Sequence, residues 1–207
     1  MGNSIQTEDK ILFTAREVFI REGYDGARMQ QIADEAGINK ALLHYYYRTK
    51  EKLFTTVFER VFTEMLNRIF SLMEEQQSLE VFLNVFFREH ITFLLSDPRL
   101  PAFIINEVSL HPELLSNIFG KFSFYGIERF GMLVEKEKEQ GLIAQRTDPL
   151  QLFINILSLS ILPVVIKPII SNVLQMDAKE TETFLRQRIE ILPEMVLASV
   201  RKDNSKK

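Results

Sequence analysis

The stretch RMQQIADEAGINKALLHYYYRTKEK, residues 28–52, decides the fold of this chain. Its first half places apolar side chains at the 3.6-residue spacing of a helix. It ends at Gly37, a residue type that readily adopts the left-handed conformation of a helix terminus. Asn39 follows, and its side-chain oxygen suits the free amides at the start of a second helix. Two short helices joined by a turn of three or four residues with a glycine are typical of a DNA-binding helix-turn-helix.

The second helix of this motif has too many aromatic side chains for one face. Leu43 and Tyr47 are four residues apart, so they lie on the same side and anchor the helix on the preceding one. A helix this short cannot also bury Tyr45 and Tyr46 on that side. Their hydroxyl groups suit phosphate oxygens and their rings suit thymine methyl groups, which predicts a nucleic-acid surface.

Positive charge is concentrated in the same stretch. The whole chain has a formal net charge of −3, which by itself argues against a nucleic-acid partner. Between residues 38 and 52, however, there are more basic side chains than acidic ones. The basic residues are Lys40, Arg48, Lys50 and Lys52, and the acidic one is Glu51. Neutralising phosphates requires a local basic patch, whereas the charge of the whole chain mainly affects solubility.

Composition narrows the function further. The 207 residues are 46% hydrophobic and 26% charged, which is the balance of a soluble globular protein. There is no cysteine, so disulfides, thiolate metal sites and cysteine nucleophiles are excluded. The sequence has no Rossmann or P-loop glycine pattern and no serine nucleophile elbow, and its histidines are scattered. We therefore predict a protein that is not an enzyme and has no cofactor or metal site. The first residues lack an apolar signal core, which favours a cytoplasmic location.

The rest of the sequence predicts helices and no strand. Apolar stripes predict a first helix over residues 7–22, ended by Gly23, and a long helix that begins after an N-cap at Thr49. In the long helix from Pro112, glycines predict a kink or a split, and Pro193 predicts a kink in the last helix. The later helices are expected at residues 78–95, 100–110, 112–140, 149–166 and 179–200.

Residues 149–166 contain no charged side chain. Such a length invites a membrane-spanning interpretation, but polar residues and a proline dilute the run, and no flanking aromatic belt supports it. A helix that is apolar on nearly all sides must then be covered by protein.

Residues 11–54, ILFTAREVFIREGYDGARMQQIADEAGINKALLHYYYRTKEKLF, resemble the N-terminal DNA-binding domain of the TetR family of bacterial transcription regulators. The similarity includes the first helix closing on EGYD, the QQIADEAG segment, the GINK turn, the aromatic recognition helix and the RTKEKLF entry into a long helix. Two departures matter. Ala27 and Arg28 stand where the family commonly has Thr or Ser, so the charge of Arg28 must replace a hydroxyl cap and phosphate contact. Leu42 stands where a small or hydroxylated residue is common, which affects one base contact.

The resemblance implies an all-α homodimer with two domains. These are a three-helix helix-turn-helix DNA-binding domain at residues 1–52 and a helical ligand-binding and dimerisation domain at residues 53–207. It places a ligand cavity among the middle helices and the dimer interface on the last two. The implied function is that of a repressor released from a palindromic double-stranded DNA operator by a mostly hydrophobic small molecule. The alternative is a DNA-binding protein whose C-terminal domain scaffolds a protein partner without small-molecule control. No membrane partner is expected.

Two sets of residues are expected to carry this function. On the DNA side, Tyr46, Thr49 and Lys50 are expected to hold phosphates. The residues expected to approach base edges in the major groove are Gln30, Lys40, Leu42, His44 and Tyr45. The DNA-binding set is Arg28, Gln30, Lys40, Ala41, Leu42, His44, Tyr45, Tyr46, Thr49 and Lys50.

The second set surrounds the implied cavity. Phenylalanines are abundant on the helices that the resemblance places there, which predicts a large apolar pocket with a few polar groups to orient the ligand. The ligand-binding set is Phe62, Phe86, Phe87, His90, Phe103, Asn106, Glu107, Phe122 and Tyr125.

Overall fold

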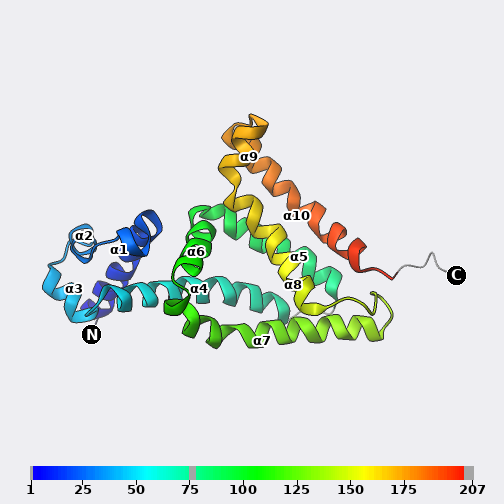
Figure 1. The fold of residues 1–207 in the computed structure, drawn as a ribbon, viewed down its shortest axis with the longest axis horizontal. Helices are drawn as coiled ribbons and strands as arrows, with labels where there is room; N and C mark the ends of the chain where they lie inside the picture. Colours follow the sequence, from blue (N-terminus) through cyan, green and yellow to red (C-terminus); the bar gives the residue numbers. More distant parts are fainter. Residues whose placement is uncertain (1, 75–77, 203–207) are drawn as a thin grey trace. The chain divides into compact units, whose positions relative to one another are not determined.

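The computed structural model describes residues 2–74 and 78–202; within them, the side chains of 2–5, of most of 66–74 and of most of 115–126 are not described. Helices α1 to α10 make up nearly all of this part of the chain (Figure 1). The extended backbone pairing within it is one isolated bridge between Ile143 and Arg201. The all-α prediction is therefore confirmed for the described residues.

Contacts between residues divide the chain into two compact units. The first unit consists of Met1–Met65 and Ala102–Gly120, and the second of Leu66–Pro101 and Lys121–Lys207. The predicted boundary after residue 52 separates the DNA-binding function from ligand binding and dimerisation, and it stays a prediction.

In the first unit the helix-turn-helix rests on α1 (Gly2–Gly26). Helix α2 (Met29–Glu35) packs against α1 and against α3 (Lys40–Tyr46), and α4 (Lys50–Glu74) begins shortly after α3. Gly23 breaks the helical geometry of α1 as predicted, with φ 69° and ψ 175°, but the chain then resumes a helix as far as Gly26. The fully buried core of these helices includes Ile11, Ala15, Val18, Phe19, Ile32, Leu43, Leu53 and Phe54.

Helix α6 (Arg99–Leu110) follows a break at Asp97 and Pro98, and α7 (Pro112–Glu139) begins at the expected proline. Helix α7 is a single helix, so the predicted split is wrong. Glycine costs about 1 kcal/mol relative to alanine inside a helix, and that cost alone does not end one.

The second unit is organised around α5 (Leu79–Ser96). It packs against α8 (Pro149–Val165) and, more extensively, against α10 (Ala178–Val200). Helix α10 is continuous through the buried Pro193. The unit's aromatic core consists of Phe82, Phe86, Phe87, Phe130 and Phe153, each of which contacts another ring of the group at 5.3–5.6 Å between centroids.

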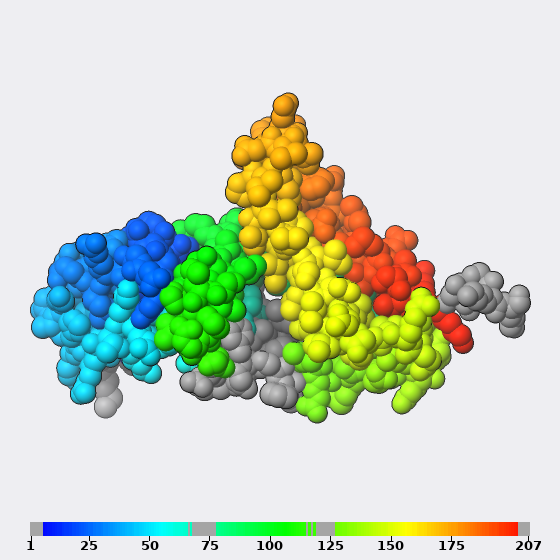
Figure 2. Space-filling view, in the orientation of Figure 1, coloured from blue at the N-terminus to red at the C-terminus, as the bar shows by residue number. Residues whose placement is uncertain are grey.

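The sequence did not predict α9 (Lys167–Leu174), a short helix that follows α8 directly. Figure 2 shows it projecting beyond the rest of the second unit, and Ile169, Val173 and Leu174 are exposed on it. It ends at Gln175, whose φ of 52° is left-handed. In the described ranges no single helix is long and apolar enough to cross a membrane, although α8 and α9, bent by 62°, together meet the criteria of length and composition.

Candidate nucleic-acid interface

The turn between α2 and α3 is built from short-range hydrogen bonds. Gly37 has φ 62°, and its amide donates to the carbonyl of Asp34 at 3.0 Å. The Asn39 side chain accepts a hydrogen bond from the amide of Leu42 at 2.7 Å. The left-handed Gly37 and the Asn39 cap were both expected from the sequence. Such residues allow the free carbonyls at the end of one helix and the free amides at the start of the next to form hydrogen bonds.

Buried side chains determine which face of α3 points outward. Leu43 is fully buried and Tyr47 nearly so, and the Tyr47 hydroxyl donates to Glu8 Oε1 at 2.9 Å. Burial and the Glu8 carboxylate raise the pKa of Tyr47 well above its usual value, so its hydroxyl remains a donor throughout the neutral range. The predicted anchoring of α3 through Leu43 and Tyr47 is confirmed.

The opposite face of α3 presents the predicted DNA-contacting residues. Tyr45 is 80% exposed, and its ring lies edge-on to that of Tyr46 at 5.5 Å between centroids. Lys40 and Ala41 are also exposed, while Leu42, His44 and Tyr46 are half-buried. The structure thus brings six predicted residues together on one short helix: Lys40, Ala41, Leu42, His44, Tyr45 and Tyr46.

The start of α4 is more constrained than the sequence indicated. Thr49 caps it, its hydroxyl accepting from the amide of Lys52 at 3.1 Å. The ammonium of Lys50 donates to the carbonyls of Tyr24 at 2.9 Å and of Asp25 and Ala27 at 3.3 Å. In this structure, Lys50 therefore binds the end of α1, and its contact with phosphate stays a prediction.

The two predicted residues at the start of α2, Arg28 and Gln30, are exposed. Arg28 stands at the N-cap of α2 and makes no capping hydrogen bond through its side chain. Gln30 donates to Asp34 at 2.8 Å. Arg28 is thus available for a phosphate, while Gln30 must exchange an internal hydrogen bond for a base contact.

The predicted ligand-binding residues belong to different units. Phe62, Phe103, Asn106 and Glu107 are in the first, Phe86, Phe87 and His90 in the second, and the side chains of Phe122 and Tyr125 lie outside the described residues.

Their surroundings in the first unit differ from the expected ones. Phe103 packs against Phe54 and Phe58, at 6.3 and 6.1 Å between ring centroids, and Asn106 is exposed. Glu107 is 1% exposed, and its carboxylate accepts hydrogen bonds from the amide of Tyr24. Sequence reasoning missed this contact because nothing near either residue indicates that they meet.

His90 is the buried polar group of the predicted set in the second unit. Its Nδ1 lies 3.0 Å from the Ser160 hydroxyl, which itself donates to a carbonyl of α8. On the other side of the ring, Nε2 has no hydrogen-bond partner among the described atoms. Burial lowers the pKa of His90 to about 4, so the ring is neutral at physiological pH.

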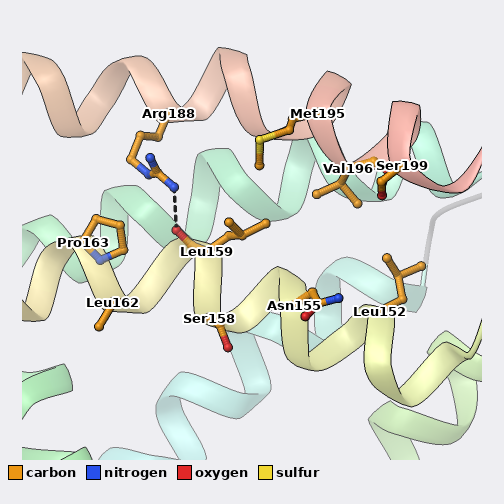
Figure 3. Close-up of a pocket in the computed structure, with 10 residues that line it drawn as sticks. All are labelled: Leu152, Asn155, Ser158, Leu159, Leu162, Pro163, Arg188, Met195, Val196 and Ser199. Atoms are coloured by element: carbon orange, nitrogen blue, oxygen red, sulfur yellow. Dashed lines mark hydrogen bonds between the residues drawn. The ribbon is translucent and has the colours of Figure 1, made fainter.

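A groove of about 400 Å³ lies between α8 and α10 of the second unit (Figure 3). Arg188 donates to the carbonyl of Leu159 at 3.1 Å across it, and burial lowers the pKa of Arg188. Polar groups are few along the rest of the groove. The lining residues are Leu152, Asn155, Ser158, Leu159, Leu162, Pro163, Arg188, Met195, Val196 and Ser199.

Comparisons with known proteins agree with this geometry. The model of the bacterial regulatory proteins of the tetR family matches residues 11–57. The HTH-type transcriptional repressor NicS of Pseudomonas putida is 32% identical over 116 residues, 54% of this chain and 46% of NicS, so the match spans about half of that relative. The probable HTH-type regulator YttP of Bacillus subtilis is 26% identical over 85% of this chain and 86% of its own. Among solved structures, FadR of Bacillus subtilis in complex with stearoyl-CoA has a TM-score of 0.68 and 16% identity over 94% of this chain and all of that chain. This last likeness concerns the fold alone.

Proposed function

We propose that this chain, whose residues 11–57 match the model of the bacterial regulatory proteins of the tetR family, is a cytoplasmic repressor of that family. It binds a palindromic DNA operator as a homodimer and leaves it when a mostly hydrophobic small molecule binds. The observation that carries the proposal is the outward face of α3, where Lys40 and Tyr45 are exposed while Leu43 and Tyr47 hold the helix in place.

The face of α3 suits the major groove. A lysine reaches guanine acceptors, and a tyrosine ring packs on thymine methyl groups. One helix of seven residues makes few base contacts, so specificity requires two copies, whose recognition helices lie about 34–36 Å apart on the operator.

The apolar groove between α8 and α10 supports the homodimer. Leu162, Ile191 and Met195 are exposed in one copy, and α8 carries no charge. A second copy related by a two-fold axis would present the same apolar surface and cover this one.

His90 supports control by a small molecule. Its Nε2 has no hydrogen-bond partner among the described atoms, and its ring lies 4.9 Å from that of Phe86 between centroids. A buried polar atom without a partner costs about 1–3 kcal/mol, which a hydrogen bond to a ligand would recover. The FadR structure with a similar fold was solved in complex with stearoyl-CoA, and for this protein we propose an apolar effector that carries a hydrogen-bonding group.

The test begins with an operator selected from random DNA. Lys40→Ala and Tyr45→Ala should each change the preferred sequence and weaken binding by about 1–3 kcal/mol for a lost base contact. Lys136→Ala, which removes an exposed lysine from α7, is the matched control and should leave binding unchanged. Unchanged affinity in all three variants would remove α3 from the DNA.

The effector is tested by a thermal-shift screen of apolar compounds, followed by titration with and without operator. An inducer must bind the DNA-free protein more tightly, because a ligand of equal affinity for both states shifts neither. If no apolar compound binds and a protein partner is found instead, the second domain is a scaffold.

A further inference from the structure

The kink in α1 is built for the close approach of a carboxylate. Gly23 has φ 69° and ψ 175°, a backbone conformation almost confined to glycine. A Cβ on Gly23 would lie 3.1 Å from Oε1 of Glu107, too close for ordinary contact. Glycine is therefore required here both by the backbone conformation and by its neighbour on α6.

Glu107 uses that approach to hold the next peptide. The amide of Tyr24 donates to both carboxylate oxygens at 3.3 Å, and the Asn106 side chain donates to Oε1 at 3.4 Å. His111 lies beside this contact, its ring 5.0 Å from that of Tyr24 and its Nε2 3.9 Å from Oε2 of Glu107. Burying a carboxylate costs several kcal/mol unless hydrogen bonds compensate it, so this arrangement is expensive for packing alone.

The carbonyl side of Tyr24 is held by the ammonium group of Lys50. The carbonyl of Tyr24 accepts from the ammonium of Lys50 at 2.9 Å, and that ammonium lies 4.5 Å from the centre of the Tyr24 ring. Tyr24 therefore lies between an anion at its amide and a cation at its carbonyl. Hydrogen bonds in such a chain polarise one another, so losing one weakens the other.

We propose that Glu107 is a positioning residue for DNA binding: through Tyr24 it holds the ammonium of Lys50 and the start of α4 in place. The inference rests on the proposed function, because it concerns affinity for the operator. It gives α6 a specific task, since α6 carries Glu107 and a displacement of this helix changes how Tyr24 is held.

The first measurement does not need DNA. Hydrogen exchange is followed in peptides covering residues 24–28 of the full-length protein. Glu107→Met keeps the length of the side chain and an apolar fit but removes the acceptor, so exchange at Tyr24 should accelerate at least about tenfold for a lost charge-assisted bond. Glu107→Gln retains an acceptor oxygen and should restore most of the protection.

Glu113→Gln is the matched control for the loss of charge. Glu113 lies 3.9 Å from His111, as Glu107 does, but it is largely exposed and has no hydrogen bond to Tyr24. Exchange at residues 24–28 should stay as in the wild type. Equal exchange in the wild type and Glu107→Met would overturn the proposal.

The second measurement is a double-mutant cycle on operator affinity, corrected for the active fraction. Glu107→Met should weaken binding roughly tenfold in the wild-type background but less than about twofold in the Lys50→Ala background, because the two residues act through one peptide. A residue that merely supports the fold would lower affinity equally in both backgrounds, and that result would overturn the role of Glu107. Gly23→Ala disturbs the same contact from α1, so it repeats the cycle if Glu107→Met does not fold. A wild-type protein that binds no operator would instead refute the proposed function.

Discussion

The helix-turn-helix and the α8–α10 segment differ in how far a single copy of the chain covers their apolar side chains. In the helix-turn-helix, Leu43 is fully covered and Asn39 satisfies the free amide of Leu42. In the α8–α10 segment, Asp148 caps α8 equally well, at 2.8 Å from the amide of Gln151, but Leu162 remains 55% exposed. Capping determines where a helix begins in both regions, whereas only the first region covers its own apolar face.

The substitution with the strongest predicted consequence lies in the groove between α8 and α10. Leu162→Glu places a carboxylate where we propose that a second copy packs. A buried charge without a partner costs about 3–5 kcal/mol, so the dissociation constant of the dimer should rise by at least about a hundredfold. Analytical ultracentrifugation measures it, and operator binding at low protein concentration should fall with it.

Leu142→Glu is the control for this substitution. Leu142 is 56% exposed, almost the same as Leu162, but it lies in the loop after α7 and not on the groove. Its variant should dimerise as the wild type does. Equal weakening in both variants, or a monomeric wild type at micromolar concentration, would count against the interface.

The second prediction concerns the buried histidine of the second unit. The pKa of His90 is about 4 in the folded protein and near 6.5 when the chain is unfolded. Between these pH values the unfolded state binds the proton more readily than the folded state. The contribution of neutral His90 to the stability of the fold is therefore complete above about pH 6.5 and is lost as the pH falls towards 4. The loss should approach about 3 kcal/mol.

The measurement compares the wild type with His90→Gln, which does not titrate there. The free energy of unfolding is determined at fixed protein concentration from pH 7 to pH 4.5, because dimerisation would otherwise shift it. The wild type should lose about 2–3 kcal/mol more than the variant over this range. Parallel curves would show that His90 is not buried as a neutral ring.

What the sequence predicts correctly in both regions is short-range. Asn39 and Thr49 each bond an amide three residues further along, and Gly37 closes α2 within the same turn. The helix expected from residue 149 begins there, after Asp148, which caps it in the same way. These contacts depend on residue type and spacing alone, so a reading of neighbouring residues finds them.

What the sequence does not predict is long-range. Glu107 and Tyr24 are 83 residues apart, and His90 and Ser160 are 70 apart. Each residue by itself has several possible roles, and the fold selects one. For this reason the contact of Glu107 with the end of α1 was not expected, while its contact with a ligand stays a prediction.

The weakest predicted effect comes from removing one helix cap in each of the two regions. Asn39→Ala and Asp148→Ala each delete a single hydrogen bond to an amide and should each cost about 1 kcal/mol, or roughly 2–4 °C in melting temperature. Only Asn39 lies at the start of the recognition helix, so Asn39→Ala should also weaken operator binding by roughly three- to tenfold as α3 loses its fixed first turn. Asp148→Ala should change operator affinity less than about twofold, since α8 belongs to the second unit and its packing against α5 and α10 holds it without the cap. Thermal unfolding and operator titration of the two variants side by side decide the matter: equal effects on DNA affinity would mean that the cap of α3 has no special part in positioning the DNA-reading face.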